Sequence, residues 1–217
     1  MHRLSLLAVL AALYALNAAA AADDPLVAPA HFLQPDDPAW SDLLHHADRP
    51  SAITADFQEN RWFPFKKIPV VLKGEVRVSA EHGLSLHYLA PDEHIIILDR
   101  QGLLVRQTSG DRSPPADPRT AAANSALLHV LSFDLRPLAD RFELYGRREG
   151  DAWNIALVPR DPDLRSTLGQ ISVAGEGPAV RRIELRRSAL QRVEILVDPP
   201  RRTGLAFTPD ELHRFFR

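Results

Sequence analysis

The chain has 217 residues, of which 45% are hydrophobic and 25% are charged, and its formal net charge is -2. This composition is enough to bury a real core, and the small net charge gives no support for nucleic acid as a partner. The absence of cysteine excludes disulfides and thiolate metal sites.

Residues 1–22 have the pattern of a secretory signal peptide. A short basic start precedes the apolar run 4–16, and small residues follow before two aspartates. The run is short for a membrane anchor, because a span needs about 20 apolar residues. We therefore expect cleavage after Ala20 or Ala22, and a mature single domain over 23–217 that is free outside the cytoplasm.

The first half of the mature chain is predicted to hold one helix and then several strands. Residues 38–48 place apolar side chains at i, i+3, i+4 and i+7, the pattern of a short amphipathic helix. Alternating apolar and polar residues then predict strands, and the links between them are too short for parallel crossovers. We expect these antiparallel strands over 53–62, 71–79, 84–89, 94–99 and 103–107.

The second half switches between helical and strand patterns. Residues 108–119 have the composition of a loop, and 159–167 that of a loop or a single helical turn. Helices are expected at 120–133, near 136–141 and, from a capping box, at the C-terminus from Thr208. Strands are expected at 141–147, 152–158, 191–198 and in a hairpin within 170–187. The order predicts an α+β protein that is mainly antiparallel β.

Motifs for catalysis and for metal binding are missing from the sequence. There is no G-x-S-x-G, no P-loop, no HExxH and no histidine pair at helical spacing. In an alternating strand, His87 points to the side opposite Leu84 and Leu86, so it is expected to face solvent. We expect no catalytic residues, no metal and no cofactor, although a pair of carboxylates acting as in a glycosidase stays open.

The apolar face of the strands is either an ordinary core or the wall of a cavity for an apolar ligand, and periodicity alone does not decide between them. The connection 63–70 raises a related question, because Phe63, Phe65 and Ile68 are more apolar than a loop needs. We expect these three side chains to form an exposed apolar lip that touches a membrane or a partner.

Five sequence motifs, in order, resemble the LolA family of periplasmic outer-membrane lipoprotein carriers. They are ADFQENR (55–61), GEVRV (74–78), LSLHYLAPDEHIIIL (84–98), WNIALVP (153–159) and GPAVRRIEL (177–185). The resemblance covers about residues 45–198. It implies an incomplete β-barrel of about 11 antiparallel strands, closed by helices around an apolar cavity that takes acyl chains, in a monomer of the periplasm.

The resemblance also implies which residues face the cargo and which partners are needed. The cargo is an acylated lipoprotein or lipid, received from an inner-membrane donor transporter and passed to an outer-membrane acceptor. In the expected fold the mid-chain helix is a lid over the cavity. The expected lining residues are Phe57, Val76, Val78, Leu84, Leu86, Ile95, Ile97, Leu127, Leu128, Leu131, Trp153, Ile155 and Leu157.

The sequence departs from the typical carriers at two positions. Where those carriers have an arginine followed by a proline after the second strand, this chain has Ala80 and Glu81, and the family tryptophan on the next strand corresponds to Leu86. The resemblance therefore does not extend to the arginine that helps to control opening in those carriers. Other cargo remains open, namely a lipid, a glycolipid or a pigment precursor of a specialised export system, as do a sensor of lipidated proteins and an exported hydrolase.

Overall fold

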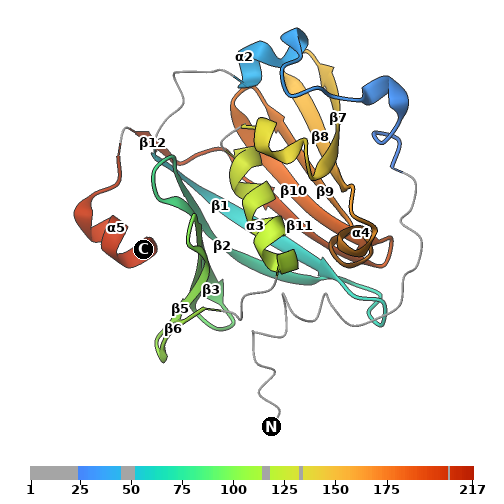
Figure 1. Cartoon of the computed structure of the whole chain (residues 1–217). Helices are drawn as coiled ribbons and strands as arrows, with labels where there is room; N and C mark the ends of the chain where they lie inside the picture. The colour runs from blue at the N-terminus through green and yellow to red at the C-terminus, as the bar shows by residue number, and fades with distance from the viewer. Residues whose placement is uncertain (1–23, 45–51, 114–117, 132–133, 205) are drawn as a thin grey trace.

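The computed structural model describes residues 24–44, 52–113, 118–131, 134–204 and 206–217 (Figure 1). Within these residues, twelve strands form one sheet in the order β6-β5-β4-β3-β2-β1-β11-β10-β9-β8-β7, and β12 pairs with β1. The strands are β1 Ala52–Trp62, β2 Val70–Ser79, β3 Gly83–Ala90, β4 His94–Asp99, β5 Gly102–Gln107, β6 Gly110–Arg112, β7 Phe142–Glu149, β8 Ala152–Pro159, β9 Gln170–Glu176, β10 Ala179–Ser188, β11 Gln191–Val197 and β12 Arg202–Gly204.

Every strand pair in this sheet is antiparallel, which confirms the predicted fold class. Most neighbours along the sheet are also neighbours along the chain, as expected for a meander with short links. The exceptions are the pairings of β1 with β11 and with β12, which join the two halves of the chain. The sheet is open, with β6 and β7 at its two ends.

Helices and short 3-10 turns surround the sheet. The C-terminal helix has the predicted capping box, in which the Thr208 hydroxyl accepts from the Glu211 backbone and the Glu211 carboxylate accepts from the Thr208 backbone. The helical elements are η2 Pro29–His31, η3 Pro38–Trp40, α2 Ser41–Leu44, α3 Pro118–Leu131, η4 Arg136–Leu138, α4 Pro162–Leu168 and α5 Pro209–Phe215.

Three details differ from the predicted elements. Part of the expected loop 108–119 is strand β6, and β12 follows the two prolines that were expected to end the last strand. The expected helix at 38–48 is η3 and α2 as far as Leu44, and the rest lies outside the described residues. Edge strands of three residues lack the length over which alternation can be recognised, so sequence periodicity missed them.

Helix α3 lies across one face of the sheet, which we call the inner face (Figure 1). Over β7–β10, buried side chains of this face pack against Ala122, Ala126 and Val130 of α3. Trp153 is the largest of them, is 1% exposed and donates its ring N–H to the Gly177 carbonyl at 2.8 Å. Burial of this apolar face holds α3 on the sheet.

Helix α5 covers the opposite, outer face of β2–β5 (Figure 1). Phe207, Phe215 and Phe216 pack there on Ile97 and Leu104. The interface also covers His87, which is 5% exposed, lies 5.5 Å from the Phe215 ring centroid to centroid and contacts Glu93 at 2.8 Å. The prediction that His87 faces solvent is therefore wrong, because a helix from the far end of the chain covers it.

Candidate functional site: the apolar inner face under helix α3

Between α3 and strands β1–β5 lies a second apolar cluster of the inner face, which we call the inner-face cluster. Its buried members come from four neighbouring strands, and its half-buried members include residues of α3 and β11. The buried members are Ala55, Phe57, Val76, Leu84, Leu86, Tyr88 and Leu98, and the half-buried ones are Leu72, Val78, Ile96, Leu103, Leu127, Leu128, Ile195 and Val197.

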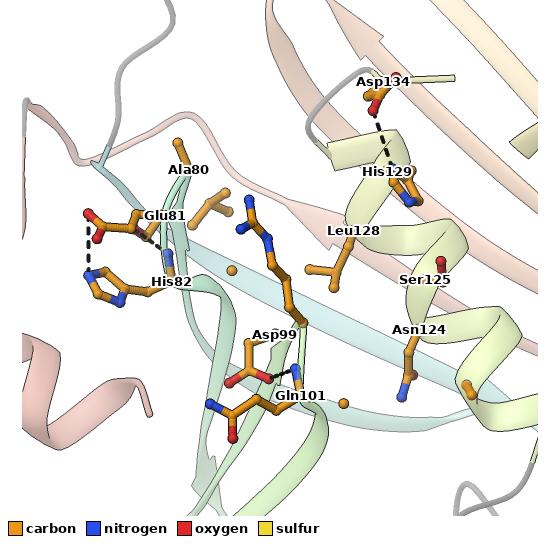
Figure 2. Close-up of a pocket in the computed structure, with 16 residues that line it drawn as sticks. Ala80, Glu81, His82, Asp99, Gln101, Asn124, Ser125, Leu128, His129 and Asp134 are labelled. Carbon is orange, nitrogen blue, oxygen red and sulfur yellow. Dashed lines mark hydrogen bonds and ion pairs between the residues drawn. The ribbon is translucent and has the colours of Figure 1, made fainter. Parts of the chain in front are cut away.

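A pocket of about 540 Å³ opens at one end of the inner-face cluster, and we call it the mouth pocket (Figure 2). The β2–β3 turn, the β4–β5 turn and α3 form its walls. Figure 2 shows Asn124 and Leu128 of α3 projecting toward these turns. Val78 and Leu128 belong to both the pocket and the inner-face cluster, so the pocket leads onto apolar surface.

Some of the charged groups that line the mouth pocket are held in ion pairs. Arg217 forms a bidentate ion pair with Asp99, with two distances of 2.8 Å, and His129 lies 3.6 Å from Asp134. Ala80 and Glu81, at the positions where the typical carriers have arginine and proline, lie in the β2–β3 turn that lines the pocket. The mouth is therefore a polar rim around an apolar interior, the usual composition of a site for an amphiphile.

A buried polar network lies on the inner face toward the other end of the same strands. Arg61 donates to both carboxylate oxygens of Glu59, at 2.5 and 3.0 Å, and the Tyr88 hydroxyl donates to Glu59 at 2.5 Å. Burial and the nearby Glu59 raise the pKa of Tyr88 well above its usual value, so the hydroxyl stays protonated. The network therefore gives the apolar inner face a fixed polar boundary.

His94 stacks on Tyr88 with ring centroids 4.5 Å apart, and it is 5% exposed. Its Nδ1 donates to the Asp92 carbonyl at 2.7 Å, while Nε2 is buried without a hydrogen-bond partner among the described residues. Burial lowers the pKa of His94 below 6.5. The imidazole is therefore neutral at pH 7.

We expect His94 to make the protein sensitive to mild acid. Because its pKa is lower in the folded than in the unfolded protein, its contribution to stability is complete above about pH 6.5 and is lost as the pH falls toward the folded pKa. His94→Phe keeps the stacked ring and removes the proton site. Urea unfolding between pH 5 and 7 should show a smaller loss of stability with acid in His94→Phe, and equal slopes would contradict this assignment.

The structure distributes the predicted lining residues among several places. Seven of them lie in the inner-face cluster, and two of these seven, Val78 and Leu128, also line the mouth pocket. The side chain of Leu131 lies outside the described residues. Trp153, Ile155 and Leu157 lie in the separate core over β7–β10, which Leu127 also contacts. The seven are Phe57, Val76, Val78, Leu84, Leu86, Leu127 and Leu128.

The predicted placement of Ile95 and Ile97 on the same face as Leu84 and Leu86 is wrong. The register pairs Leu84 with Leu98, and Leu86 with Ile96. Directly paired residues of antiparallel strands share a face. Ile95 and Ile97 therefore point to the outer face, where both belong to the cluster that packs under α5.

Sequence reasoning also missed residues that the inner face does use. Ile96 and Leu98 belong to the inner-face cluster, as do Tyr88 and Val197. The run 95–98 is apolar at every position, so alternation gives no signal for which residues point inward. Direct pairing across the β3–β4 turn decides it, and that pairing is a property of the folded hairpin.

No group of three or more histidine, aspartate or glutamate side chains suited to a metal ion occurs within the part of the chain that the structure describes. Nor does any helix among those residues have the length and apolar character needed to cross a membrane. The inner-face cluster and its mouth pocket are thus the candidate site, and they have the character of a binding surface.

The sequence model of one protein family matches residues 11–198, most of the chain, and that family is described as "Outer membrane lipoprotein carrier protein LolA-like". The chain belongs to this family. A comparison with curated protein sequences found no match. The mouth pocket and the inner-face cluster lie within the matched residues, whereas helix α5 follows them.

Several solved structures are similar to the chain at low sequence identity. MucB, in a crystal structure with MucA(peri), is 17% identical with a TM-score of 0.43, covering 82% of this chain and 59% of that chain. A LolA superfamily protein from Nitrosomonas europaea is 9% identical with a TM-score of 0.36, covering 80% and 94%. A putative outer membrane lipoprotein-sorting protein domain from Vibrio parahaemolyticus is 7% identical with a TM-score of 0.35, covering 76% and 90%.

Proposed function

We propose that this protein is a periplasmic carrier that binds the acyl chains of a lipoprotein or lipid and moves them from the inner to the outer membrane. The observation that supports this most directly is a pocket of about 540 Å³ that leads onto the inner-face cluster beneath α3. The family to which the chain belongs is one of lipoprotein carriers. Its members are carriers or binding proteins rather than enzymes.

The chemistry of the inner-face cluster fits an acyl chain. Each CH₂ group moved from water into apolar surroundings contributes about 0.8 kcal/mol, so binding needs no covalent step. The rim at Ser79, Asn124 and Ser125 offers hydrogen-bonding groups to the polar end of the cargo. An acyl chain that enters here would lie with its tail among the half-buried residues Val78, Ile96 and Leu103.

Release of the cargo requires that the lid can move relative to the sheet. Leu127 and Leu128 of α3 are only half-buried on the inner-face cluster, whereas Ala126 and Val130 are fully buried over β7–β10. The helix is therefore held more firmly on one half of the sheet than on the other. Loading would widen the gap between α3 and the turns after β2 and β4.

Leu128→Glu should weaken acyl-chain binding by about tenfold or more, because it places a carboxylate where the tail would lie. The position is half-buried, so the variant should keep the fold, which circular dichroism and thermal melting would verify. Binding is measured with a fluorescent palmitoyl probe. Phe32→Glu is the matched control, because Phe32 is apolar, 45% exposed and on the β7 side of the sheet.

Native mass spectrometry of protein purified from the periplasm without detergent then identifies the class of cargo. A bound lipid or an acylated protein supports the proposal, and its mass distinguishes the two. Unchanged palmitoyl binding by folded Leu128→Glu would remove the inner-face cluster as the site. In that case the apolar face would be an ordinary core.

A further inference from the structure

Exposed apolar side chains are concentrated at one end of the sheet. Of the six large apolar side chains that are exposed among the described residues, only Phe32 lies elsewhere. We propose that this end, the docking end, binds the surface of a membrane that contains anionic phospholipids. Its apolar members are Phe65 (77% exposed), Ile68 (76%), Val71 (48%), Leu89 (53%) and Leu190 (64%).

Strand register brings these residues together although they are far apart in sequence. Phe65 and Ile68 lie in the connection between β1 and β2, and Val71 is the second residue of the return strand β2. Trp62, at the end of β1, pairs with Arg192, so the β10–β11 turn that carries Leu190 ends beside it. The pairing of Lys73 with Ala90 brings the last residues of β3, including Leu89, to the same end.

The lysines of the chain all lie at this end, although its arginines are spread along the whole sequence. The chain has only three lysines, Lys66, Lys67 and Lys73, and all three lie in the β1–β2 connection or the first residues of β2. All three are exposed, and none forms an ion pair with a described residue. Lysine next to exposed aromatic and aliphatic residues is typical of segments that bind anionic membranes.

The acidic residues nearby lie to one side of the docking end. Asp92 and Glu93 are exposed in the β3–β4 turn after Leu89, where Glu93 contacts His87 at 2.8 Å and lies 3.9 Å from Arg214. These carboxylates would be repelled by anionic lipid. We therefore place the centre of the contact at the β1–β2 connection and only its margin at Leu89.

The β1–β2 connection is held in the shape that presents these side chains. The Phe63 and Phe65 rings stack with centroids 5.5 Å apart, and the Lys66 amide donates to the Phe63 carbonyl at 3.0 Å. Pro64 and Pro69 restrict the backbone on both sides. A preordered segment loses less conformational entropy on binding. Most of the free energy gained by burying the exposed Phe65 and Ile68 is therefore available for docking.

A membrane fits this end, because the apolar side chains are spread over the β1–β2 connection, the β10–β11 turn and the ends of β2 and β3. Lipid adapts to side chains spread in this way, and lysine stems extend from the apolar layer to phosphate groups. Trp62 lies beside them, half-buried, with the Arg192 guanidinium 4.1 Å from its ring centroid. Tryptophan and arginine are suited to the same interfacial layer.

The docking end lies away from the mouth pocket. The pocket is formed by the turns after β2 and β4, whereas the docking end is formed by the connections before β2 and after β3. A docked protein therefore keeps its mouth pocket accessible. Docking does not require the inner-face cluster to be occupied, so it stands independently of the proposed carrier function.

The test is co-sedimentation with vesicles of phosphatidylglycerol mixed with phosphatidylcholine, and with vesicles of phosphatidylcholine alone. We expect binding to the mixed vesicles, weakened at least tenfold by Phe65→Ser/Ile68→Ser. Lys66→Gln/Lys67→Gln should weaken it about 25-fold, since each lysine near an anionic surface contributes about fivefold. Added salt should reduce binding of the wild type more than that of the lysine variant.

Two matched controls separate the docking end from general surface properties. Phe32→Ser removes the exposed apolar side chain that lies elsewhere, and Arg112→Gln/Arg147→Gln removes two exposed charges outside the docking end. Both should bind like the wild type. All proteins are purified by one route and share an N-terminus. Trp62 should report docking by a blue shift in fluorescence, because Trp40 and Trp153 are already buried.

Three results would overturn the proposal. They are the absence of binding to the mixed vesicles, equal binding to vesicles of phosphatidylcholine alone, and unchanged binding by Phe65→Ser/Ile68→Ser. The first would leave a protein as the occupant of the docking end. Leu128→Glu should bind vesicles like the wild type, so failure of the carrier proposal and failure of the docking proposal give different results.

Discussion

Glu59→Ala should lower the free energy of unfolding by about 3–5 kcal/mol, because it leaves a buried arginine without its counter-charge. Glu59 is 3% exposed and accepts two hydrogen bonds from Arg61 and one from Tyr88. Arg61 is itself 8% exposed, so water cannot replace the lost carboxylate. Urea unfolding at pH 7 measures the change.

The same network offers a sharp control. Replacing all of its polar groups, in Glu59→Leu/Arg61→Leu/Tyr88→Phe, removes the buried charges together and should restore most of the lost stability. The loss in Glu59→Ala would then be attributable to the unpaired guanidinium. A loss below about 1 kcal/mol in Glu59→Ala would show that the network is open to water.

Phe216→Ala should destabilise the protein by a similar amount, about 3–5 kcal/mol, through loss of buried area and the cavity left behind. Phe216 is 2% exposed and packs on Phe207, with ring centroids 5.2 Å apart. Its carbonyl also accepts from Arg106 at 3.1 Å, which the substitution leaves in place. The measurement therefore isolates the side chain that seats the C-terminal segment on the outer face.

Phe65→Ala is the matched control for this prediction. The residue type and the atoms removed are identical, but Phe65 is 77% exposed, so its loss should change stability by no more than about 0.5 kcal/mol. A small effect of Phe216→Ala would mean that α5 contributes little to folding. The outer face of β4 would then need another explanation for its apolar residues.

The difference between these two phenylalanines shows what the sequence could and could not predict. The sequence identified the connection 63–70 as too apolar for a loop, and the exposure of Phe65 and Ile68 agrees with that interpretation. It also predicted the C-terminal helix from its capping box. It did not predict that this helix covers the strand face that holds Ile95 and His87, because nothing local specifies where a helix docks.

The candidate site was predicted only in part, because sequence patterns do not specify how separate segments align. Within one strand, alternation fixes which side chains share a face, and so Val76 with Val78 and Leu84 with Leu86 were grouped correctly. Between strands, the turn and the hydrogen-bond register decide the alignment, and a shift of one residue reverses every face. This is why the uniformly apolar run 95–98 was assigned to the inner face at the wrong positions.

The strand-rich antiparallel fold, the central helix, the capped C-terminal helix and the family could all be predicted from residue patterns, because they depend on local periodicity, short links and motif order. Three features became apparent only from the folded chain: which apolar residues meet under α3, the joint burial of Glu59 and Arg61, and the assembly of the docking end from separate segments. Those features depend on pairing between separate segments, which lie more than 100 residues apart in the case of β1 with β11. Residue patterns within a single segment do not specify that pairing.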